Sequence, residues 1–433
     1  MKENIALQLD FGEEFKINQP KKKDLSSTFA DNMSLPIHKW FRYTAGFSAD
    51  WVKQVFKDFP NANNVLDPFV GSGTVLVEGD FNAKTTFGVE AHPLIYKVAR
   101  AKLNWKINPD EFLESTKLIL ENAKKIKICD ELNYPPLITK CYPEPTIERL
   151  TKLKEAFLKT DLRDELKELN WFVINSILRV SSPVGTAQWQ YVLPAKTKSK
   201  VLEPFTAFKN KAYEMFADMK FMQRKVKVQG NSTLIKGDSR NLIGIETNSI
   251  DLVITSPPYA NNYDYADATR LELSFWGEIN GWGDLQDSVR KNLIRACTQH
   301  VANLKNNTEE IFNSEVLIPI KDELRHKFEA LALERLDHGG KKNYHLMALA
   351  YFKDLGDTFV ALRRVCKEKS DICFVVGDSA PYGIHLPVEK WLGELAMGAG
   401  FNSWSFEKLR DRNIKWKNRK HRHPLHEGRL WIK

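Results

Sequence analysis

Short apolar runs alternate with helical patterns in the first quarter of the chain. A run at 63–69 leads into a helical pattern that reaches about Phe81, and a second run at 85–90 precedes a helical pattern at 93–105. Short runs that are nearly continuous in apolar residues are typical of parallel strands covered on both faces. The order strand, turn, helix, strand therefore predicts a βαβ unit of a doubly wound α/β sheet.

Three more strand patterns come much later, at 233–237, 250–256 and 371–377. Two long stretches, at 105–230 and 260–345, have largely helical patterns and interrupt the series of strands. Neither of these insertions is a repeat of the other or of low complexity. Before the first strand, Ser48 is positioned to cap a buried helix. We expect six regions: a polar arm at 1–35, the first part of the core at 36–104, a helical insertion at 105–230, core strands at 231–259, a second helical insertion at 260–345, and the remaining core with a basic tail at 346–433.

Composition narrows the class of protein. The chain has 433 residues, of which 42% are hydrophobic, and this excludes a disordered or collagen-like chain. Its five cysteines are an odd number without a CxxC pair, which favours a reducing compartment. The first residues lack a signal-peptide pattern, and no apolar run is long enough to span a bilayer. We therefore expect a cytoplasmic protein with no membrane partner.

The positive charge is concentrated at the end of the chain. Residues 408–433 hold ten Lys and Arg side chains against Asp411 and Glu427. Cations interleaved with tryptophans are expected on a surface that meets phosphates, although a solvated basic terminus gives the same pattern.

The first candidate site is the loop from Asp67 to Thr74, between the first strand and its helix. Gly71 and Gly73 let the backbone approach a ligand at the carboxyl end of a strand, where open α/β sheets bind nucleotides. The sequence matches neither a phosphate-binding P-loop nor a nucleophile elbow. A tight turn without a ligand remains the alternative.

Two acids at later strand ends strengthen this interpretation. Glu90 ends the second strand about twenty residues after the glycines, where a carboxylate can bind the hydroxyls of a ribose. Asp238 follows the third strand and can accept a hydrogen bond from an adenine amino group. Each acid alone has a plain alternative as a cap or a solvated loop end.

The segment Thr255-Ser256-Pro257-Pro258-Tyr259 ends the fourth strand. Two consecutive prolines remove two backbone donors and hold the chain extended, so carbonyl oxygens face outward without an internal partner. Such carbonyls can accept hydrogen bonds from a planar amino group, and Tyr259 offers a face on which a nucleobase can stack. A rigid loop is the structural alternative.

These motifs together resemble a known family. DPFVGSGT followed by GVE, GDSRN and TSPPY is similar to the S-adenosylmethionine-dependent amino methyltransferases of DNA, and TSPPYANNYDYADATRLELSFWG resembles a bacterial subgroup of site-specific enzymes. The resemblance covers about residues 36–104, 230–280 and 345–405, and leaves both insertions unmatched. It implies a Rossmann-like methyltransferase core, S-adenosylmethionine as cofactor and double-stranded DNA as substrate, and it leaves open whether a cognate restriction endonuclease is a partner.

The resemblance also implies roles for individual residues. Ser before PPY favours cytosine N4 as the target, with adenine N6 as the nearest alternative; an RNA base methyltransferase and a non-catalytic DNA-binding subunit are more distant. The residues expected to hold the base are Ser256, Pro257, Pro258 and Tyr259. The residues expected to bind the cofactor are Tyr43, Phe47, Asp67, Phe69, Gly71, Gly73, Glu90, Asp238 and Thr255.

Sequence recognition is assigned to the first insertion, with the second insertion and the basic tail as rivals. Amides can read adenine edges and lysines can contact phosphates. The candidates are Gln188, Gln190, Lys196 and Lys198 in the insertion and Arg419, Lys420 and Arg422 in the tail. The histidines of HRHPLH lack a completing carboxylate or thiol and lie among arginines, so we expect no metal site there.

Overall fold

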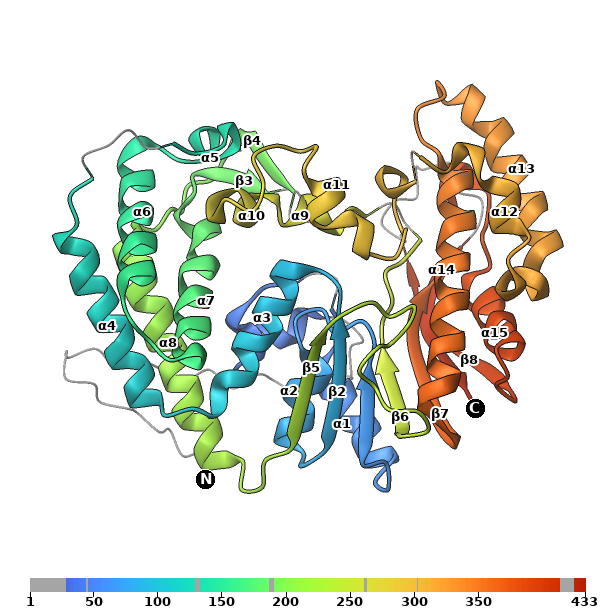
Figure 1. Cartoon of the computed structure of the whole chain (residues 1–433), viewed down its shortest axis with the longest axis horizontal. Helices are drawn as coiled ribbons and strands as arrows, with labels where there is room; N and C mark the ends of the chain where they lie inside the picture. Colours follow the sequence, from blue (N-terminus) through green and yellow to red (C-terminus); the bar gives the residue numbers. More distant parts are fainter. Residues whose placement is uncertain are drawn as a thin grey trace.

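The centre of the molecule is a seven-stranded sheet with the strand order β5-β2-β1-β6-β7-β9-β8 (Figure 1). Its pairs are parallel except that β9 runs antiparallel to both of its neighbours. The computed structural model describes residues 29–43, 46–128, 133–186, 191–260, 263–301, 303–412 and 424–433. The sheet comprises β1 (Asn64–Asp67), β2 (Thr85–Glu90), β5 (Asn231–Lys236), β6 (Ile250–Thr255), β7 (Cys366–Gly377), β8 (Trp404–Arg412) and β9 (Leu425–Ile432).

The central strands are buried on both faces, which explains their nearly continuous apolar sequences. Because successive side chains point to opposite faces, Val65 and Leu252 pack on the side of α1 and α2, while Leu66 and Val253 pack on the side of α14 and α15. The predicted Ser48 cap is confirmed, since its side chain accepts a hydrogen bond from the Trp51 amide. These helices are α1 (Ala49–Asp58), α2 (Thr74–Phe81), α14 (Tyr344–Val365) and α15 (Val388–Gly398).

The first insertion is largely helical, as predicted, and its helices share one apolar core with α3 (Pro93–Leu103) (Figure 1). It is fastened to the segment before β1, because Asp218 accepts hydrogen bonds from Trp40 and Lys39. A two-stranded hairpin within it was not predicted. The insertion comprises α4 (Pro109–Lys125), α5 (Pro136–Cys141), α6 (Glu144–Lys159), α7 (Asp164–Ser181), β3 (Val184–Thr186), β4 (Val192–Thr197) and α8 (Pro204–Lys225).

In its described residues, the second insertion contains four short α-helices and the longer α13, and it runs from the first insertion across to α14 (Figure 1). It comprises α9 (Tyr265–Ala268), α10 (Arg270–Trp276), α11 (Leu285–Ser288), α12 (Thr308–Phe312) and α13 (Lys321–Asp337). Short 3-10 helices lie at Phe29–Ser34, His38–Trp40, Asn104–Lys106, Arg290–Asn292, Thr298–His300, Leu304–Asn306, Glu315–Ile320 and Pro381–Gly383.

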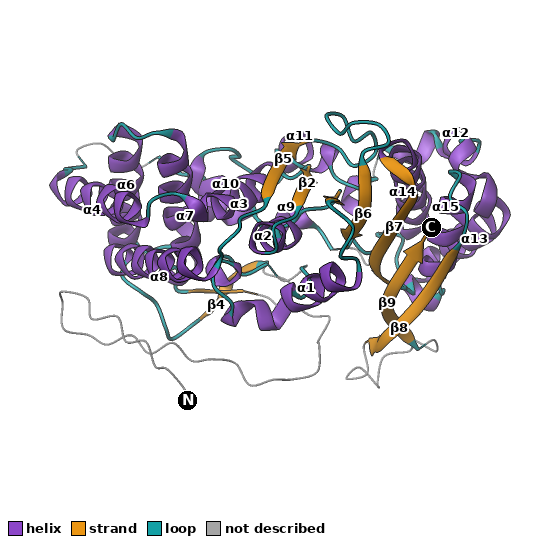
Figure 2. Ribbon diagram, turned by 90° about the horizontal axis from the view of Figure 1, so that it is seen from below, coloured by secondary structure: helices purple, strands orange, loops and turns teal. Residues whose placement is uncertain are grey.

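The prediction of a basic tail in residues 408–433 is wrong for 408–412 and 425–432, which form strands. The end of β8 and all of β9 belong to the sheet, and β9 is hydrogen-bonded between β7 and β8 (Figure 2). Leu430 and Ile432 are fully buried. The sequence concealed this strand because the polar and charged residues His426, Glu427 and Arg429 interrupt its apolar residues, so the net charge dominated the pattern. Deleting the whole segment would therefore remove an inner strand of the sheet.

Within the described part of the chain, no helix is both long enough and apolar enough to cross a membrane.

Candidate active site

The loop after β1 is built around two glycines in left-handed conformations. Gly71 has φ +53° and Gly73 has φ +86°, and Gly73 is the residue that precedes the first turn of α2. A Cβ atom on Gly71 would lie 2.8 Å from Cε1 of Tyr43, so the aromatic ring packs directly on the backbone there. The sequence therefore needs glycine at this position for both its backbone conformation and its close contact.

A cavity opens above this loop at the carboxyl ends of the strands. Its walls come from the segment before β1, the glycine loop, the end of β2, the loop after β5, the segment after β6 and a segment of the second insertion. Seven residues predicted from the sequence line it: Tyr43, Phe47, Phe69, Gly71, Glu90, Ser256 and Pro258. The structure thus brings two predicted sites, about 170 residues apart in the sequence, to one cavity.

Asp67 lies beneath the cavity rather than in its lining. Its Oδ1 accepts hydrogen bonds from the Phe69 amide at 3.0 Å and the Thr255 hydroxyl at 2.6 Å. Its Oδ2 is buried and has no hydrogen-bond partner among the described residues. Burial raises the pKa of Asp67 to about 7, and the two hydrogen bonds oppose this rise. Thr255 therefore contacts Asp67 and helps to hold this carboxylate in place.

Glu90 forms one wall of the cavity and joins β2 to the glycine loop. Its Oε2 accepts from the Gly71 amide and its Oε1 from the His92 amide, each at 2.8 Å. Burial raises the pKa of Glu90 to about 7. His92, which the sequence reading missed, also lines the cavity and caps α3 through Nδ1.

Asp238 is held by a neighbouring cation. Arg240 donates to both of its carboxylate oxygens, with the shortest contact, from Nη2 to Oδ2, at 2.6 Å. The residue of this loop that lines the cavity is Ser239. Arg240 also reaches the buried Asp354 on α14, a residue that no sequence motif singled out.

The segment after β6 is tied to the end of β7. The Ser256 hydroxyl donates to the Val375 carbonyl at 3.0 Å, and the Ser379 hydroxyl donates to the Ala260 carbonyl. Because the Ser256 hydrogen is used in this bond, the lone pairs of its oxygen can accept hydrogen bonds from a ligand. Pro257 is buried beside the cavity-lining Pro258.

Tyr259 lies under an arginine from the far end of the sheet. The Arg412 guanidinium carbon is 5.0 Å from the centre of the Tyr259 ring, and Nη1 of Arg412 donates to the Asp378 carbonyl at 2.9 Å. Burial raises the pKa of Tyr259 above its usual value, so the phenol is protonated near neutral pH. Arg412 ends β8 and could be assigned to this place only after the position of that strand was known.

The candidate DNA-reading residues are described only in part. Lys196 is exposed on β4, whereas the Lys198 ammonium donates to the Arg179 carbonyl. In Figure 2, β4 and the ends of β8 and β9 lie along the same edge of the molecule. Gln188, Gln190, Arg419, Lys420 and Arg422 lie outside the described residues.

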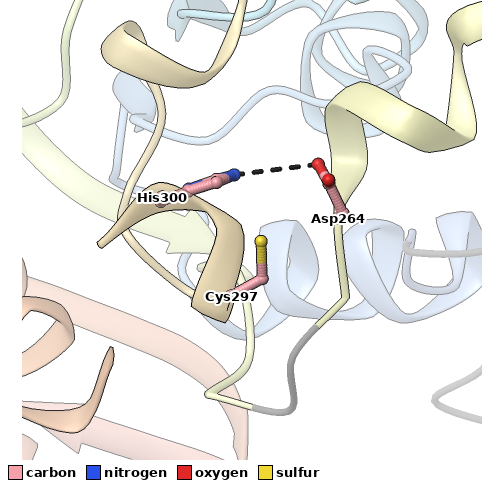
Figure 3. A group of neighbouring side chains, drawn as sticks. All are labelled: Asp264, Cys297 and His300. Atoms are coloured by element: carbon pink, nitrogen blue, oxygen red, sulfur yellow. Dashed lines mark ion pairs between the residues drawn. The ribbon is translucent and has the colours of Figure 1, made fainter. Parts of the chain in front are cut away.

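Among the residues that the structure describes, two groups of side chains have the composition of a metal site. One consists of Asp264, Cys297 and His300, all buried (Figure 3). Its carboxylate already accepts a 2.6 Å hydrogen bond from Arg290, and although burial raises the pKa of Asp264, the neighbouring His300 and Arg290 side chains lower it to about 2. The guanidinium therefore supplies the positive charge that this carboxylate needs.

The other group is Asp378, Glu389 and His426. Here the His426 ring bridges the two carboxylates, at 3.2 Å from Asp378 and 3.3 Å from Glu389. These ion pairs join β9 to the loop after β7 and to α15. The other histidines of HRHPLH lie outside the described residues.

Comparison with known proteins gives relatives of one kind. The chain is 24% identical to the type II methyltransferase M.BsoBI of Geobacillus stearothermophilus over 89% of this chain and 82% of that protein. It is 24% identical to the type II methyltransferase M.AvaI of Anabaena variabilis, over 92% and 86%, and 23% identical to the type II methyltransferase M.MvaI of Kocuria varians, over 81% and 79%. No protein-family model matches the chain. The chain thus combines two findings: a Rossmann-like α/β core with a cavity at the carboxyl ends of its strands, and sequence similarity to type II methyltransferases over most of its length.

Proposed function

We propose that this protein is a site-specific DNA methyltransferase that transfers a methyl group from S-adenosylmethionine to the exocyclic N4 of cytosine. The observation that carries the proposal is the single cavity shared by Gly71 and Glu90 on one side and Ser256 and Pro258 on the other. The similarity to type II methyltransferases supports the same reaction class.

The charges beside the cavity suit S-adenosylmethionine, which carries an ammonium group and a sulfonium. Asp67 offers a buried oxygen that has no partner in the described structure, and Glu90 is a second buried carboxylate. We propose that Asp67, Phe69, Gly71 and Gly73 hold the methionine part and that Glu90 binds the ribose. Two further sets of residues complete the proposed cofactor site: Asp238 for the adenine, and Tyr43, Phe47 and Thr255 as walls and supports.

The acceptor residues suit an amino group that becomes positively charged as it takes the methyl. The Ser256 oxygen and the Pro257 carbonyl can accept its N–H bonds, which increases electron density on the nitrogen. Fixed acceptor dipoles stabilise the developing charge without a strong base, and the rate depends on aligning the two reactants. S-adenosylmethionine supplies the electrophilic methyl group when bound.

A cytosine inside a duplex cannot reach this cavity, so the target nucleotide must leave the base stack, which costs a few kcal/mol. We propose that stacking on Tyr259 offsets part of this cost. The basic residues Arg419, Lys420 and Arg422 are proposed to contact the DNA backbone. Changing all three to Gln should weaken DNA binding and reduce its salt dependence without altering the sequence that is methylated.

The test is to incubate the purified protein with isotopically labelled S-adenosylmethionine and unmethylated genomic DNA, and to identify the labelled nucleoside by mass spectrometry. We expect N4-methylcytosine. Ser256→Ala should lower kcat by about 100-fold because it removes a fixed acceptor dipole, and Tyr259→Ala should also lose activity. Ser405→Ala, on an exposed part of β8, serves as the matched control.

Each other outcome has a definite meaning. N6-methyladenine would keep the reaction class and overturn the choice of base. Label in RNA alone would overturn DNA as the substrate, and no label in any nucleic acid would overturn the proposed reaction.

The names of the relatives also support a role beside a restriction endonuclease. We propose that the methylated sequence is the one that such a partner cleaves. Mapping N4-methylcytosine in DNA from cells that express the chain should give a single short motif, and DNA modified at that motif should resist the endonuclease encoded next to it. Methylation without sequence preference would contradict this role.

A further inference from the structure

The segment Arg290–Arg295 of the second insertion forms a partition between two hollows. Asn292, Leu293 and Ile294 line the cavity proposed for the cofactor. The flanking Arg290 and Arg295 line a second, open hollow that also borders α14. The segment contains only one short 3-10 turn, so its shape depends on how its two ends are held.

The first end is held by Asp264, five residues after Tyr259. Arg290 is 2% exposed, and its Nη2 and Nε lie 2.6 Å and 3.1 Å from Oδ2 of Asp264. His300 flanks the same carboxylate at 3.8 Å (Figure 3), and the Trp282 ring lies 4.1 Å from the Arg290 guanidinium carbon. This end is therefore fixed to the segment that follows the proposed base site.

The second end is held by Asp354, in the middle of α14. Arg295 donates to it three times: from Nη2 to Oδ1 at 2.6 Å, from Nε to Oδ2 at 2.9 Å and from its backbone amide to Oδ2 at 3.0 Å. Asp354 is 1% exposed, so this charge-assisted arrangement is shielded from solvent on the side of the carboxylate.

The same carboxylate reaches the opposite wall of the cavity. Arg240 lies 3.4 Å from Oδ1 of Asp354 and binds Asp238 at 2.6 Å. Ser239, between the two ends of that pair, lines the cofactor cavity. Asp354 thus connects the loop after β5 with the segment Arg290–Arg295, and it touches neither the cavity nor the reacting atoms.

We propose that Asp354 is a positioning residue for S-adenosylmethionine, which fixes two walls of the cofactor cavity by holding Arg295 and Arg240. The inference rests on the proposed function. Its physical basis is preorganisation: a wall that is already ordered loses less conformational entropy when the cofactor binds. Without the carboxylate, two neighbouring guanidinium groups lose their shared partner and repel each other.

The test compares Asp354→Asn with Asp357→Asn. Asp357 lies three residues after Asp354 on α14, borders the same open hollow and pairs with Lys353. Asp357→Asn therefore removes the same charge from the same part of the helix. We expect Asp354→Asn to weaken S-adenosylmethionine binding by about tenfold or more, as small displacements of positioning groups do, and Asp357→Asn to leave the Kd within about twofold of wild type. Equilibrium dialysis with labelled cofactor measures these values on the full chain.

Kinetics distinguish positioning from general loss of structure. Asp354→Asn should raise KM for S-adenosylmethionine, recover kcat at saturating cofactor and leave KM for DNA unchanged. Because replacing a buried carboxylate can prevent folding, Arg295→Gln provides a second variant: it keeps Asp354 paired with Arg240 and should weaken cofactor binding by a smaller factor.

The outcomes separate this inference from the proposed function. If the wild type binds S-adenosylmethionine and the folded Asp354→Asn and Asp357→Asn variants both bind it as tightly as the wild type, the inference is overturned and the proposed function stands. If Asp354→Asn does not fold, unchanged binding by Arg295→Gln has the same meaning. A wild type that does not bind S-adenosylmethionine would overturn both.

Discussion

Gly71→Ala tests the packing of the proposed cofactor loop. Two costs are expected. The residue has φ +53°, and a left-handed conformation costs a residue with a Cβ about 1–2 kcal/mol. The new Cβ would also lie 2.8 Å from Cε1 of the partly buried Tyr43 ring, so the ring must move, at a cost of about 1–3 kcal/mol. Both should lower the free energy of unfolding, and displacement of Tyr43 should narrow the cofactor cavity.

Gly277→Ala is the matched control, because it separates these two costs. Gly277 ends α10 with φ +76°, and nothing lies within 4 Å of the place where its Cβ would be. Gly277→Ala should therefore lower the free energy of unfolding only by the cost of the left-handed backbone conformation. Urea unfolding and equilibrium dialysis with S-adenosylmethionine should show Gly71→Ala to be less stable than Gly277→Ala by about 1–3 kcal/mol, and to bind the cofactor at least about tenfold more weakly.

A double-mutant cycle with Tyr43→Ala checks the cause. If the ring is responsible, Tyr43→Ala should remove most of the additional destabilisation caused by Gly71→Ala and leave the effect of Gly277→Ala unchanged. Equal destabilisation by the two alanine variants, together with wild-type cofactor affinity in both, would refute the reasoning.

Three further predictions concern charge. Because burial raises the pKa of both Asp67 and Glu90 to about 7, these groups become ionised as the pH rises through 7, so the affinity for the cationic cofactor should strengthen between about pH 6 and pH 8; calorimetric titrations over this range measure it, and an affinity independent of pH would contradict the prediction. The folded state binds these protons more tightly than the unfolded chain does, so the free energy of unfolding of the cofactor-free protein should fall as pH rises from about 4 to 7, which urea unfolding at several pH values measures. Arg412→Gln removes the cation above Tyr259 and should lower kcat/KM for DNA by about tenfold with unchanged cofactor affinity. Arg363→Gln, which removes an arginine that packs on the Phe401 ring instead of on Tyr259, is its control, and equal activity of the two variants would argue against a role for Arg412.

The sequence alone determined the local parts of the candidate site. Gly71 and Gly73 specify a left-handed loop, and the consecutive prolines after β6 specify an extended one, because these residues restrict or release the backbone in any context. Each motif follows an apolar strand, and parallel strands bring their carboxyl ends to one edge. The shared cavity of Glu90 and Ser256 could therefore be anticipated without knowing the path of the chain between them.

Only the tertiary structure decided which other residues meet these motifs. Arg412 reaches Tyr259 because β8 and β9 complete the sheet, and the polar and charged residues between Leu425 and Leu430 hid the pattern of β9. The segment Arg290–Arg295 and Asp354 come from an insertion and a helix with no distinctive motif. Their roles depend on pairings between residues that are 26 (Arg290 with Asp264), 59 (Arg295 with Asp354) and 153 (Arg412 with Tyr259) positions apart. Such pairings depend on packing and charge neutralisation in three dimensions, and no periodicity along the chain records them.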